Sequence, residues 1–207
     1  MQEYPLSWLS RCACTCLKLV NHSHASSASL PGDRAMRTQV MGHGPPTAWM
    51  PHQRWEAMVR GEDCPVCDEL AADEVENEHG FFVANLAFSR LRLSREQHVP
   101  GWCVLLCHRH VREPHELDAP QRHAFFDDMV RVGAALEGVY DALKINYAIM
   151  GNSVPHLHAH IQPRYYGDPY PGGPVSGLPP EPVHLSMHQY RQQISLIRTA
   201  LGVDTAP

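Results

Sequence analysis

Hydrophobic residues first form a regular pattern near residue 80 of the 207-residue chain. Two apolar runs, 80–88 and 102–107, are short and contain several aromatic and β-branched side chains, and the second begins directly after Gly101. Such runs are typical of β-strands. We therefore expect two neighbouring strands in this part of the chain.

A longer segment follows in which hydrophobic residues are spaced by three or four positions and share one helical face. These residues are Phe125, Met129, Val132, Leu136, Val139 and Leu143. Asp118 and Gln121 form a box-like N-cap, and Pro120 fits the first turn, where its missing N–H removes no hydrogen bond. The pattern predicts an amphipathic helix whose apolar stripe lies in the core.

Two further apolar runs, 145–150 and 154–162, flank the residues Gly151, Asn152 and Ser153. These three residues favour a turn, so a hairpin is predicted here. The order strand, strand, helix, strand, strand indicates an α+β fold. We expect an antiparallel sheet with the helix packed on one face.

A C-terminal helix is predicted after residues 167–182, whose many prolines and glycines favour neither a helix nor a central strand. Ser186 with Gln189 marks the start of this helix, and Gly202 marks its end. Its hydrophobic stripe consists of Met187, Tyr190, Ile194, Ile197 and Leu201. We expect the helix to dock on the preceding domain.

The chain divides into three parts by composition. Residues 1–50 have no sustained periodicity and are expected to be a disordered extension without chemistry, with Met41 and Met50 as alternative translation starts. Residues 51–170 contain the predicted sheet and form the main domain. Residues 171–207 contain the Pro- and Gly-rich segment and the last helix.

Charge and composition narrow the class of partner. The net charge of −5, from 17 Lys and Arg against 22 Asp and Glu, gives no basic surface for nucleic acid, so a small substrate is expected. No apolar stretch reaches the roughly 18 residues of a membrane span, and no signal-peptide pattern is present. The seven cysteines are an odd number, and a cytoplasmic location is expected, where paired cysteines are metal ligands more often than disulfides.

The strongest chemical signal is a row of three histidines, His156, His158 and His160, that alternate with apolar residues. Residues two apart in a strand face the same side, so the three imidazoles are expected on one face. Such a row serves nucleophilic catalysis or metal binding, and a surface row without a role is the plainest alternative. The spacing alone does not separate these.

Cys64 and Cys67 form a second candidate site. Their spacing lets two thiolates bind one tetrahedral zinc ion. Two incidental thiols or a redox pair are the alternatives.

Residues 151–164, Gly-Asn-Ser-Val-Pro-His-Leu-His-Ala-His-Ile-Gln-Pro-Arg, closely resemble the signature of the histidine-triad family. In that family, histidines alternate with apolar residues after an amide and a hydroxyl side chain. Residues 99–106 resemble the family's Pro-Gly turn and second strand. The resemblance covers about residues 64–164 and implies a domain that binds nucleotides.

The resemblance implies that His158 is the nucleophile and that the α-phosphate of a nucleotide passes to its ring nitrogen and then to water. A neutral imidazole is nucleophilic near pH 7 and splits the displacement into two easier steps. A main-chain carbonyl near His156 holds the other ring nitrogen. His160 then donates to a phosphate oxygen. Asn152 and Ser153 donate towards the leaving oxygen, although ordinary turn formation also explains these two residues.

Some members of the family complete the cysteine pair with two histidines, which correspond here to His110 and His156. The resemblance therefore implies a zinc ion bound by Cys64, Cys67, His110 and His156. Its role is structural, with no open coordination position. His108 is the competing ligand.

The residues that bind the nucleotide are less clearly marked. By analogy with the family, Phe82, Leu86 and Phe88 are candidates for the base pocket, and core packing explains Phe82 and Phe88 equally well. Ser94, with Glu96 nearby, lies where many members contact the ribose hydroxyls.

The predicted activity is hydrolysis at the α-phosphate of dinucleoside polyphosphates or nucleoside phosphoramidates. His160 stands where the related hexose-1-phosphate uridylyltransferases usually have Gln, which favours hydrolysis. One alternative is a nucleotidyltransferase or phosphorylase of the same superfamily, and another is a non-catalytic, zinc-stabilised nucleotide-binding protein. The resemblance is also compatible with a homodimer.

Overall fold

The computed structural model describes residues 50–72, 74–168, 170, 172–175 and 181–203. All helices and strands given below belong to the unit formed by residues 48–207. Apart from Met50, the expected disordered extension and its alternative starts lie outside the described residues.

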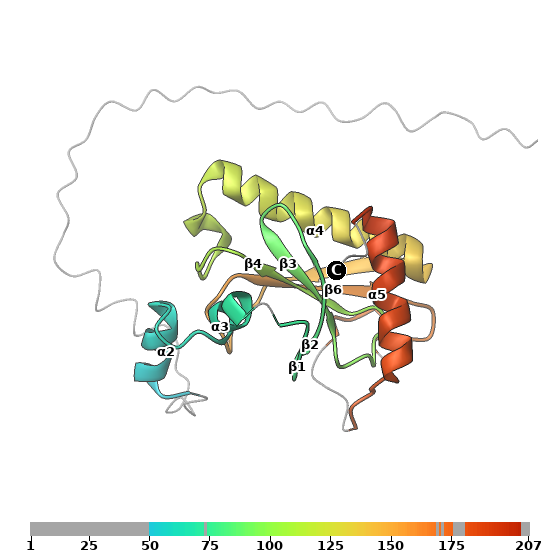
Figure 1. Ribbon diagram of the computed structural model, residues 1–207, viewed down its shortest axis with the longest axis horizontal. Helices are drawn as coiled ribbons and strands as arrows, with labels where there is room; N and C mark the ends of the chain where they lie inside the picture. Colours follow the sequence, from blue (N-terminus) through green and yellow to red (C-terminus); the bar gives the residue numbers. More distant parts are fainter. Residues whose placement is uncertain (1–49, 73, 169, 171, 176–180, 204–207) are drawn as a thin grey trace, which may run out of the picture. The chain divides into compact units, whose positions relative to one another are not determined.

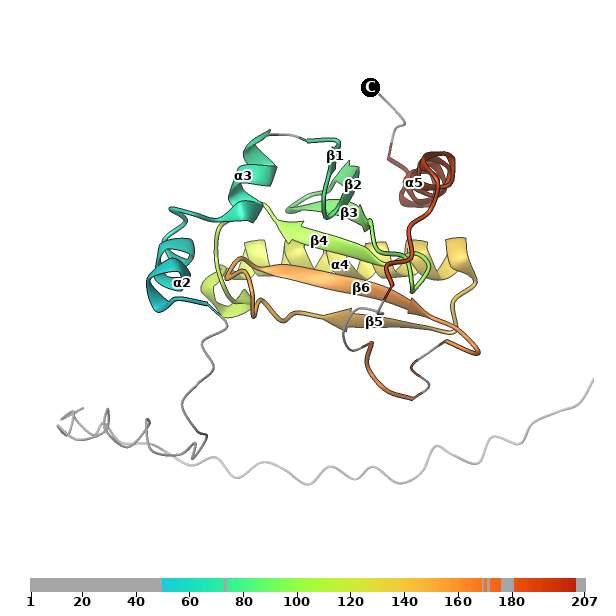
Figure 2. The ribbon, with the colours of Figure 1, turned by 90° about the horizontal axis from the view of Figure 1, so that it is seen from below.

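Six strands form one antiparallel sheet in the spatial order β1-β2-β3-β4-β6-β5 (Figure 1). Their bounds are Glu76–Asn77 (β1), Gly80–Asn85 (β2), Ser89–Ser94 (β3), Cys103–Cys107 (β4), Lys144–Ala148 (β5) and His158–Arg164 (β6). Helix α4, Ala119–Tyr140, lies on one face of this sheet (Figure 2). The predicted α+β fold is confirmed.

The prediction that runs 80–88 and 102–107 are neighbouring strands is wrong, because β3 lies between them. Leu91 and Leu93 of β3 belong to the core, whereas Arg92 is buried on the opposite face. Arginine is rarely buried unless it is paired. Here Glu69 of α3, Pro65–Ala72, lies 2.8 Å from the guanidinium of Arg92. Because arginines interrupt its apolar residues, the hydrophobic pattern did not indicate this strand.

Helix α4 has the predicted cap, because the side chain of Asp118 accepts a hydrogen bond of 2.9 Å from the main-chain N–H of Gln121. The buried part of its stripe consists of Phe125, Met129, Val132 and Leu136. Leu143 lies beyond the helix and is 55% exposed, so it does not belong to the stripe. Gly133 allows α4 to approach β5, since a Cβ atom there would lie 1.9 Å from the hydroxyl of Tyr147.

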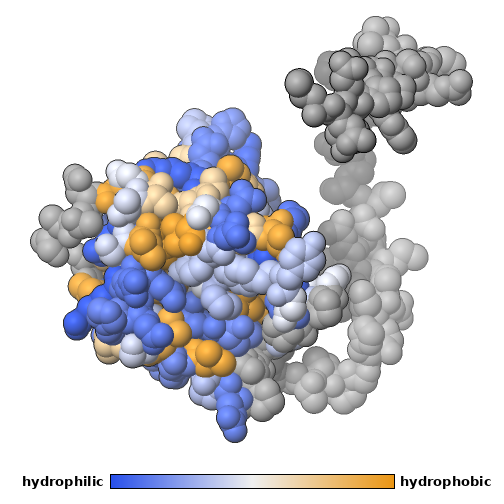
Figure 3. All heavy atoms as spheres, turned by 90° about the vertical axis from the view of Figure 1, so that its right-hand side faces the viewer, coloured by the Kyte–Doolittle hydropathy of each residue, from blue (hydrophilic) through white to orange (hydrophobic). Residues whose placement is uncertain are grey.

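The predicted C-terminal helix is α5, Met187–Leu201, and it begins with the predicted capping box of Ser186 and Gln189. It ends at Gly202, whose φ of 62° lies in the left-handed region that favours glycine. Tyr190, Ile197 and Leu201 are its buried residues. The face that carries α5 shows hydrophobic side chains scattered among hydrophilic ones (Figure 3), as expected for a helix that buries one stripe.

Helix α2, His52–Val59, and α3 precede the sheet, and the short helix η1, Pro114–Glu116, precedes α4. Residues 149–157 connect β5 to β6, a longer connection than the turn predicted at 151–153. None of the described helices combines the length and the apolar character needed to cross a membrane.

Candidate active site and metal centre

Two of the three predicted histidines share one face of β6. The ring centroids of His158 and His160 lie 5.3 Å apart, and both residues line one cavity. The strand begins at His158, and His156 lies two residues before it. Of the three histidines, His158 and His160 line the cavity, whereas the imidazole of His156 belongs to a cluster with Cys64 and Cys67.

The ring of His158 is held by a main-chain oxygen. Its Nδ1 lies 2.6 Å from the carbonyl oxygen of His156. A carbonyl oxygen only accepts hydrogen bonds, so Nδ1 carries the ring proton and Nε2 keeps its lone pair. A neutral imidazole in this tautomer is a nucleophile at Nε2.

His160 has the opposite tautomer. The indole Nε1–H of Trp102 donates to Nδ1 of His160 at 3.2 Å, so the ring proton of His160 lies on Nε2. Burial, together with the neighbouring His158, lowers the pKa of His160 to about 4. The side chain is therefore neutral near pH 7 and has one N–H to donate.

His156 is fully buried and directs its imidazole into a different cluster. Its Nε2 lies 2.8 Å from the carbonyl oxygen of Cys107, which places the ring proton there. Its Nδ1 lies 3.4 Å from Sγ of Cys64, 3.5 Å from Sγ of Cys67 and 3.2 Å from Nδ1 of His110. The residue thus contributes its side chain to this cluster and its carbonyl to His158.

The four ligand atoms of Cys64, Cys67, His110 and His156 lie within 4.8 Å of one another and form a metal site. Two sulfur and two imidazole donors are a common ligand set of structural zinc. Nε2 of His110 lies 3.1 Å from the carbonyl oxygen of Val59, so a main-chain oxygen orients each imidazole. Of the two competing histidines, the structure brings His110 and not His108 into the site.

The electrostatics of the cluster also fit a bound cation. Burial and the neighbouring Cys64 raise the pKa of Cys67 to about 12, so without a cation the Cys67 thiol stays protonated. A metal ion supplies the positive charge that stabilises two adjacent thiolates. The residues present therefore suit zinc.

His158 and His160 open into a cavity of about 810 Å³. Its floor is the face of the sheet opposite α4 and consists of Arg92, Ser94, Val104, Leu106, His158 and His160. One wall comes from α3, through Val66, Asp68 and Glu69, and another from Pro182 and His184 before α5. The cavity is thus bounded by segments that lie far apart in the sequence.

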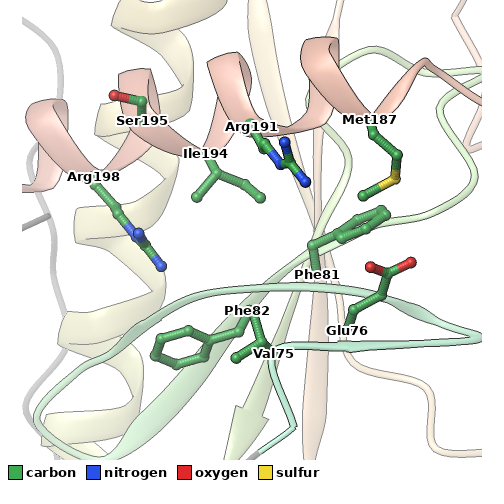
Figure 4. Close-up of a pocket in the computed structure, with 9 residues that line it drawn as sticks. All are labelled: Val75, Glu76, Phe81, Phe82, Met187, Arg191, Ile194, Ser195 and Arg198. Atoms are coloured by element: carbon green, nitrogen blue, oxygen red, sulfur yellow. The ribbon is translucent and has the colours of Figure 1, made fainter. Parts of the chain in front are cut away.

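The structure separates the predicted nucleotide-binding residues. Ser94 lines the cavity of His158. Phe82 lines a different hollow, of about 380 Å³, between β2 and α5 (Figure 4). Leu86 and Phe88 pack against the core. Contact of these three apolar residues with a base therefore has no support from their positions.

Asn152 and Ser153 lie in the connection between β5 and β6, and both are exposed. From this connection, the cavity of His158 is lined by Val154. A role for the amide and the hydroxyl as hydrogen-bond donors to substrate remains a prediction.

Sequence reasoning did not identify Trp102, Glu69 or His184 as site residues. The family-like turn before Trp102 marked the right strand, but nothing in its spacing showed that the indole would reach His160. Glu69 had a weak signal, because it follows the cysteine pair on a short helix. His184 had none, because it lies in an extended segment without periodicity.

Comparisons with known proteins agree with this geometry. Residues 78–167 match the family model of the HIT domain. A histidine triad protein from Bradyrhizobium japonicum is similar in structure, with 28% identity, a TM-score of 0.56, and coverage of 60% of this chain and 92% of that one. A histidine triad protein from Marinobacter aquaeolei has 26% identity, a TM-score of 0.58, and coverage of 67% and 96%.

A Zn-bound histidine triad family protein from Mycobacterium smegmatis has the same fold, with 18% identity, a TM-score of 0.50, and coverage of 68% of this chain and 94% of that one. No curated protein sequence matches the chain.

Proposed function

Residues 78–167 match the HIT-domain model, and we propose that this chain is a histidine-triad protein that hydrolyses nucleotides through a nucleotidyl intermediate on His158. The observation that carries the proposal is the 2.6 Å contact between Nδ1 of His158 and the carbonyl oxygen of His156. This contact leaves Nε2 unprotonated on a residue that lines the large cavity. An imidazole held in this way is prepared for attack on phosphorus.

In the first step, Nε2 of His158 attacks the α-phosphorus, the bond from phosphorus to the leaving group breaks, and the leaving group takes up a proton from solvent. The ring becomes a phosphorylated imidazolium, whose positive charge is stabilised by the carbonyl oxygen of His156. The Nε2–H of His160 donates to a non-bridging phosphate oxygen, where negative charge grows in the transition state.

In the second step, water attacks the same phosphorus, loses a proton to solvent, and the P–Nε2 bond breaks. A nucleoside monophosphate leaves, and the neutral His158 is restored. Because the two displacements use the same phosphorus, one placement of the phosphate serves both.

The charge of the cavity favours nucleoside phosphoramidates over dinucleoside polyphosphates. Among the described lining residues, the five carboxylates are Asp68, Glu69, Glu74, Glu78 and Glu96, and the two guanidinium groups are Arg92 and Arg95. An acidic lining repels a polyphosphate chain and tolerates an amine leaving group. We therefore place phosphoramidates first.

Zinc is the metal proposed for the cluster of Cys64, Cys67, His110 and His156. When bound, zinc supplies structural crosslinking and takes no substrate, since all four positions are filled. The residues it joins come from α3, from the segment after β4 and from the segment before β6. The cluster thereby stabilises the main chain that orients His158.

A second copy of the chain is proposed as a partner. Strand β5 lies at one edge of the sheet, and the exposed hydrophobic residues Leu143, Tyr147 and Met150 lie within or beside it. An exposed edge strand with apolar neighbours is a suitable surface for pairing with another copy. Light scattering after dilution would test this, and a monomer at all concentrations would contradict it.

The proposed activity is tested by incubating the protein with a mixed pool of nucleotides and nucleoside phosphoramidates. Mass spectrometry should find a nucleotidyl adduct on His158, and released nucleoside monophosphate should accumulate. If turnover requires added phosphate or a sugar phosphate, the chain is a phosphorylase or transferase. If nucleotide binds without adduct or turnover, it is a binding protein.

A further inference from the structure

The segment of residues 181–185 lies outside the histidine-triad domain but forms part of its cavity. Pro182 and His184 of this segment line the same cavity as His158 and His160. The domain match ends at residue 167. A segment outside the matched domain therefore contributes to the cavity that holds His158 and His160.

Hydrogen bonds hold this segment against the sheet. The main-chain N–H of Gln97 donates to the carbonyl oxygen of Val183 at 2.8 Å. The N–H of Val183 in turn donates to the carboxylate of Glu96, at 2.9 and 3.1 Å from its two oxygens. Val183 is thus fixed on both sides, and its neighbours Pro182 and His184 have defined positions.

The far end of the segment is anchored by α5. The hydroxyl of Tyr190, a fully buried residue, accepts a hydrogen bond of 3.1 Å from the N–H of Leu185 and donates to the carbonyl oxygen of Arg95. The ring of Tyr190 lies 4.2 Å from that of Phe81, measured between centroids. The segment is therefore a fixed wall of the cavity.

Glu96 helps to hold this wall in place through its contact with Val183. One of its oxygens also accepts from the main-chain N–H of His98 at 3.0 Å and lies 3.2 Å from Nδ1 of that residue. The carboxylate, which also lines the cavity, is therefore engaged by Val183 and His98. Its position makes Glu96 a positioning residue for the wall.

The imidazole of His184 is not engaged by the described residues in the way that the carboxylate of Glu96 is. Within the described part of the chain, no residue donates a hydrogen bond to its ring or accepts one from it. The side chain is exposed and belongs to the cavity lining. It is accordingly available to a ligand, with one nitrogen to donate and one to accept.

We propose that His184 is a substrate-binding residue that contacts an oxygen of the nucleotide away from the reacting phosphorus. Glu96 positions it through Val183. The inference rests on the proposed function only in taking a nucleotide as the ligand. The oxygen belongs to the ribose or to a phosphate, and both accept a hydrogen bond from an imidazole.

The test measures binding of AMP and GMP by calorimetry to the wild type and to His184→Ala. We expect binding to weaken by about tenfold, the effect of one lost hydrogen bond to a charged or polar group. His188→Ala is the control, because His188 is exposed on α5 and does not line the cavity. Equal affinities of the wild type and His184→Ala for both nucleotides would overturn the proposal.

Two further ligands identify the oxygen. If His184 contacts the ribose, the wild type prefers AMP to 2′-deoxy-AMP and His184→Ala does not. If it contacts the phosphate, the substitution reduces the preference for AMP over adenosine. A variant that keeps both preferences unchanged contradicts the contact.

The positioning role is tested with Glu96→Gln and Glu96→Ala. The amide oxygen of Gln can still accept from Val183, so Gln should retain most of the affinity and Ala should lose about as much as His184→Ala. The double variant Glu96→Ala with His184→Ala should be no weaker than either single variant, because both act at one contact. Additive losses of affinity would show that the two residues act at separate contacts and would contradict the positioning role of Glu96.

The inference and the proposed function fail in different ways. In steady-state assays, His184→Ala should raise KM and leave kcat close to the wild-type value, since the lost contact is remote from the reacting atoms. If the wild type binds nucleotides without hydrolysing them, the proposed function fails while the binding test of His184 still decides the inference. If the wild type turns nucleotides over and His184→Ala binds them normally, only the inference fails.

Discussion

The carbonyl oxygen of His156 lies 2.6 Å from Nδ1 of His158, while the imidazole of His156 points to Cys64, Cys67 and His110. One residue therefore links the four-residue metal cluster to the proposed nucleophile. Its main chain selects the tautomer of His158, and its side chain is a metal ligand. Loss of metal should consequently affect catalysis through the position of one carbonyl group.

The first prediction concerns the nucleophile. His158→Asn removes the atom that would form the intermediate, so turnover should fall by about 10³-fold or more. Nucleotide binding should persist, because the rest of the cavity floor is unchanged. Single-turnover assays and calorimetry measure the two effects. Activity comparable to that of the wild type would exclude the mechanism.

The second prediction concerns His160 and its indole partner. His160→Asn should reduce kcat by roughly 10²- to 10³-fold, the cost of one lost donor to the transition state. Trp102→Phe keeps a ring but removes the N–H that selects the tautomer of His160, so its effect should be smaller. If His160→Asn is more damaging than His158→Asn, the roles of the two histidines are assigned wrongly.

The third prediction concerns the metal. The purified protein should contain about one zinc ion per chain, the content of a single four-ligand site. The double substitution of Cys64 and Cys67 by Ser should remove the metal and lower the melting temperature. His156→Asn should do the same, and elemental analysis with thermal unfolding measures both. His108→Ala is the matched control and should keep the metal, because His108 is exposed and outside the cluster.

The fourth prediction concerns pH. The pKa of His160 is about 4 in the folded protein and near 6.5 in an unfolded chain. Between these values the unfolded state binds more protons, so this residue makes stability fall as pH decreases from about 6.5 towards 4. Above pH 6.5 its contribution is fully present. Urea unfolding at several pH values should show a shallower decline for His160→Asn, and parallel curves would contradict the assignment.

Much of the fold was predictable because hydrophobic periodicity and capping residues determine local structure. Both long helices began at the expected caps, Asp118 and Ser186, and the metal ligands followed from the cysteine spacing with the family resemblance. Strand β3 was not predictable in this way, because its buried Arg92 depends on a partner in α3. Residue pairs that are distant in sequence leave no periodic signal.

The candidate site, like the fold, could be predicted from the sequence only in part. His158 and His160 were assigned to one face because a strand alternates by two. His156 does not line the cavity because its imidazole contacts Cys64 and Cys67, which are distant in the sequence. The wall at residues 181–185 was missed because an extended segment held by main-chain hydrogen bonds has no side-chain pattern of its own.

The two walls of the catalytic cavity, α3 and residues 181–185, both lie outside the stretch that matches the family. The two histidines of the proposed reaction and the walls around them are therefore encoded in separate stretches of the gene. Under the proposed function, substitutions in either wall should alter the choice of ligand while the strand with both histidines keeps its sequence.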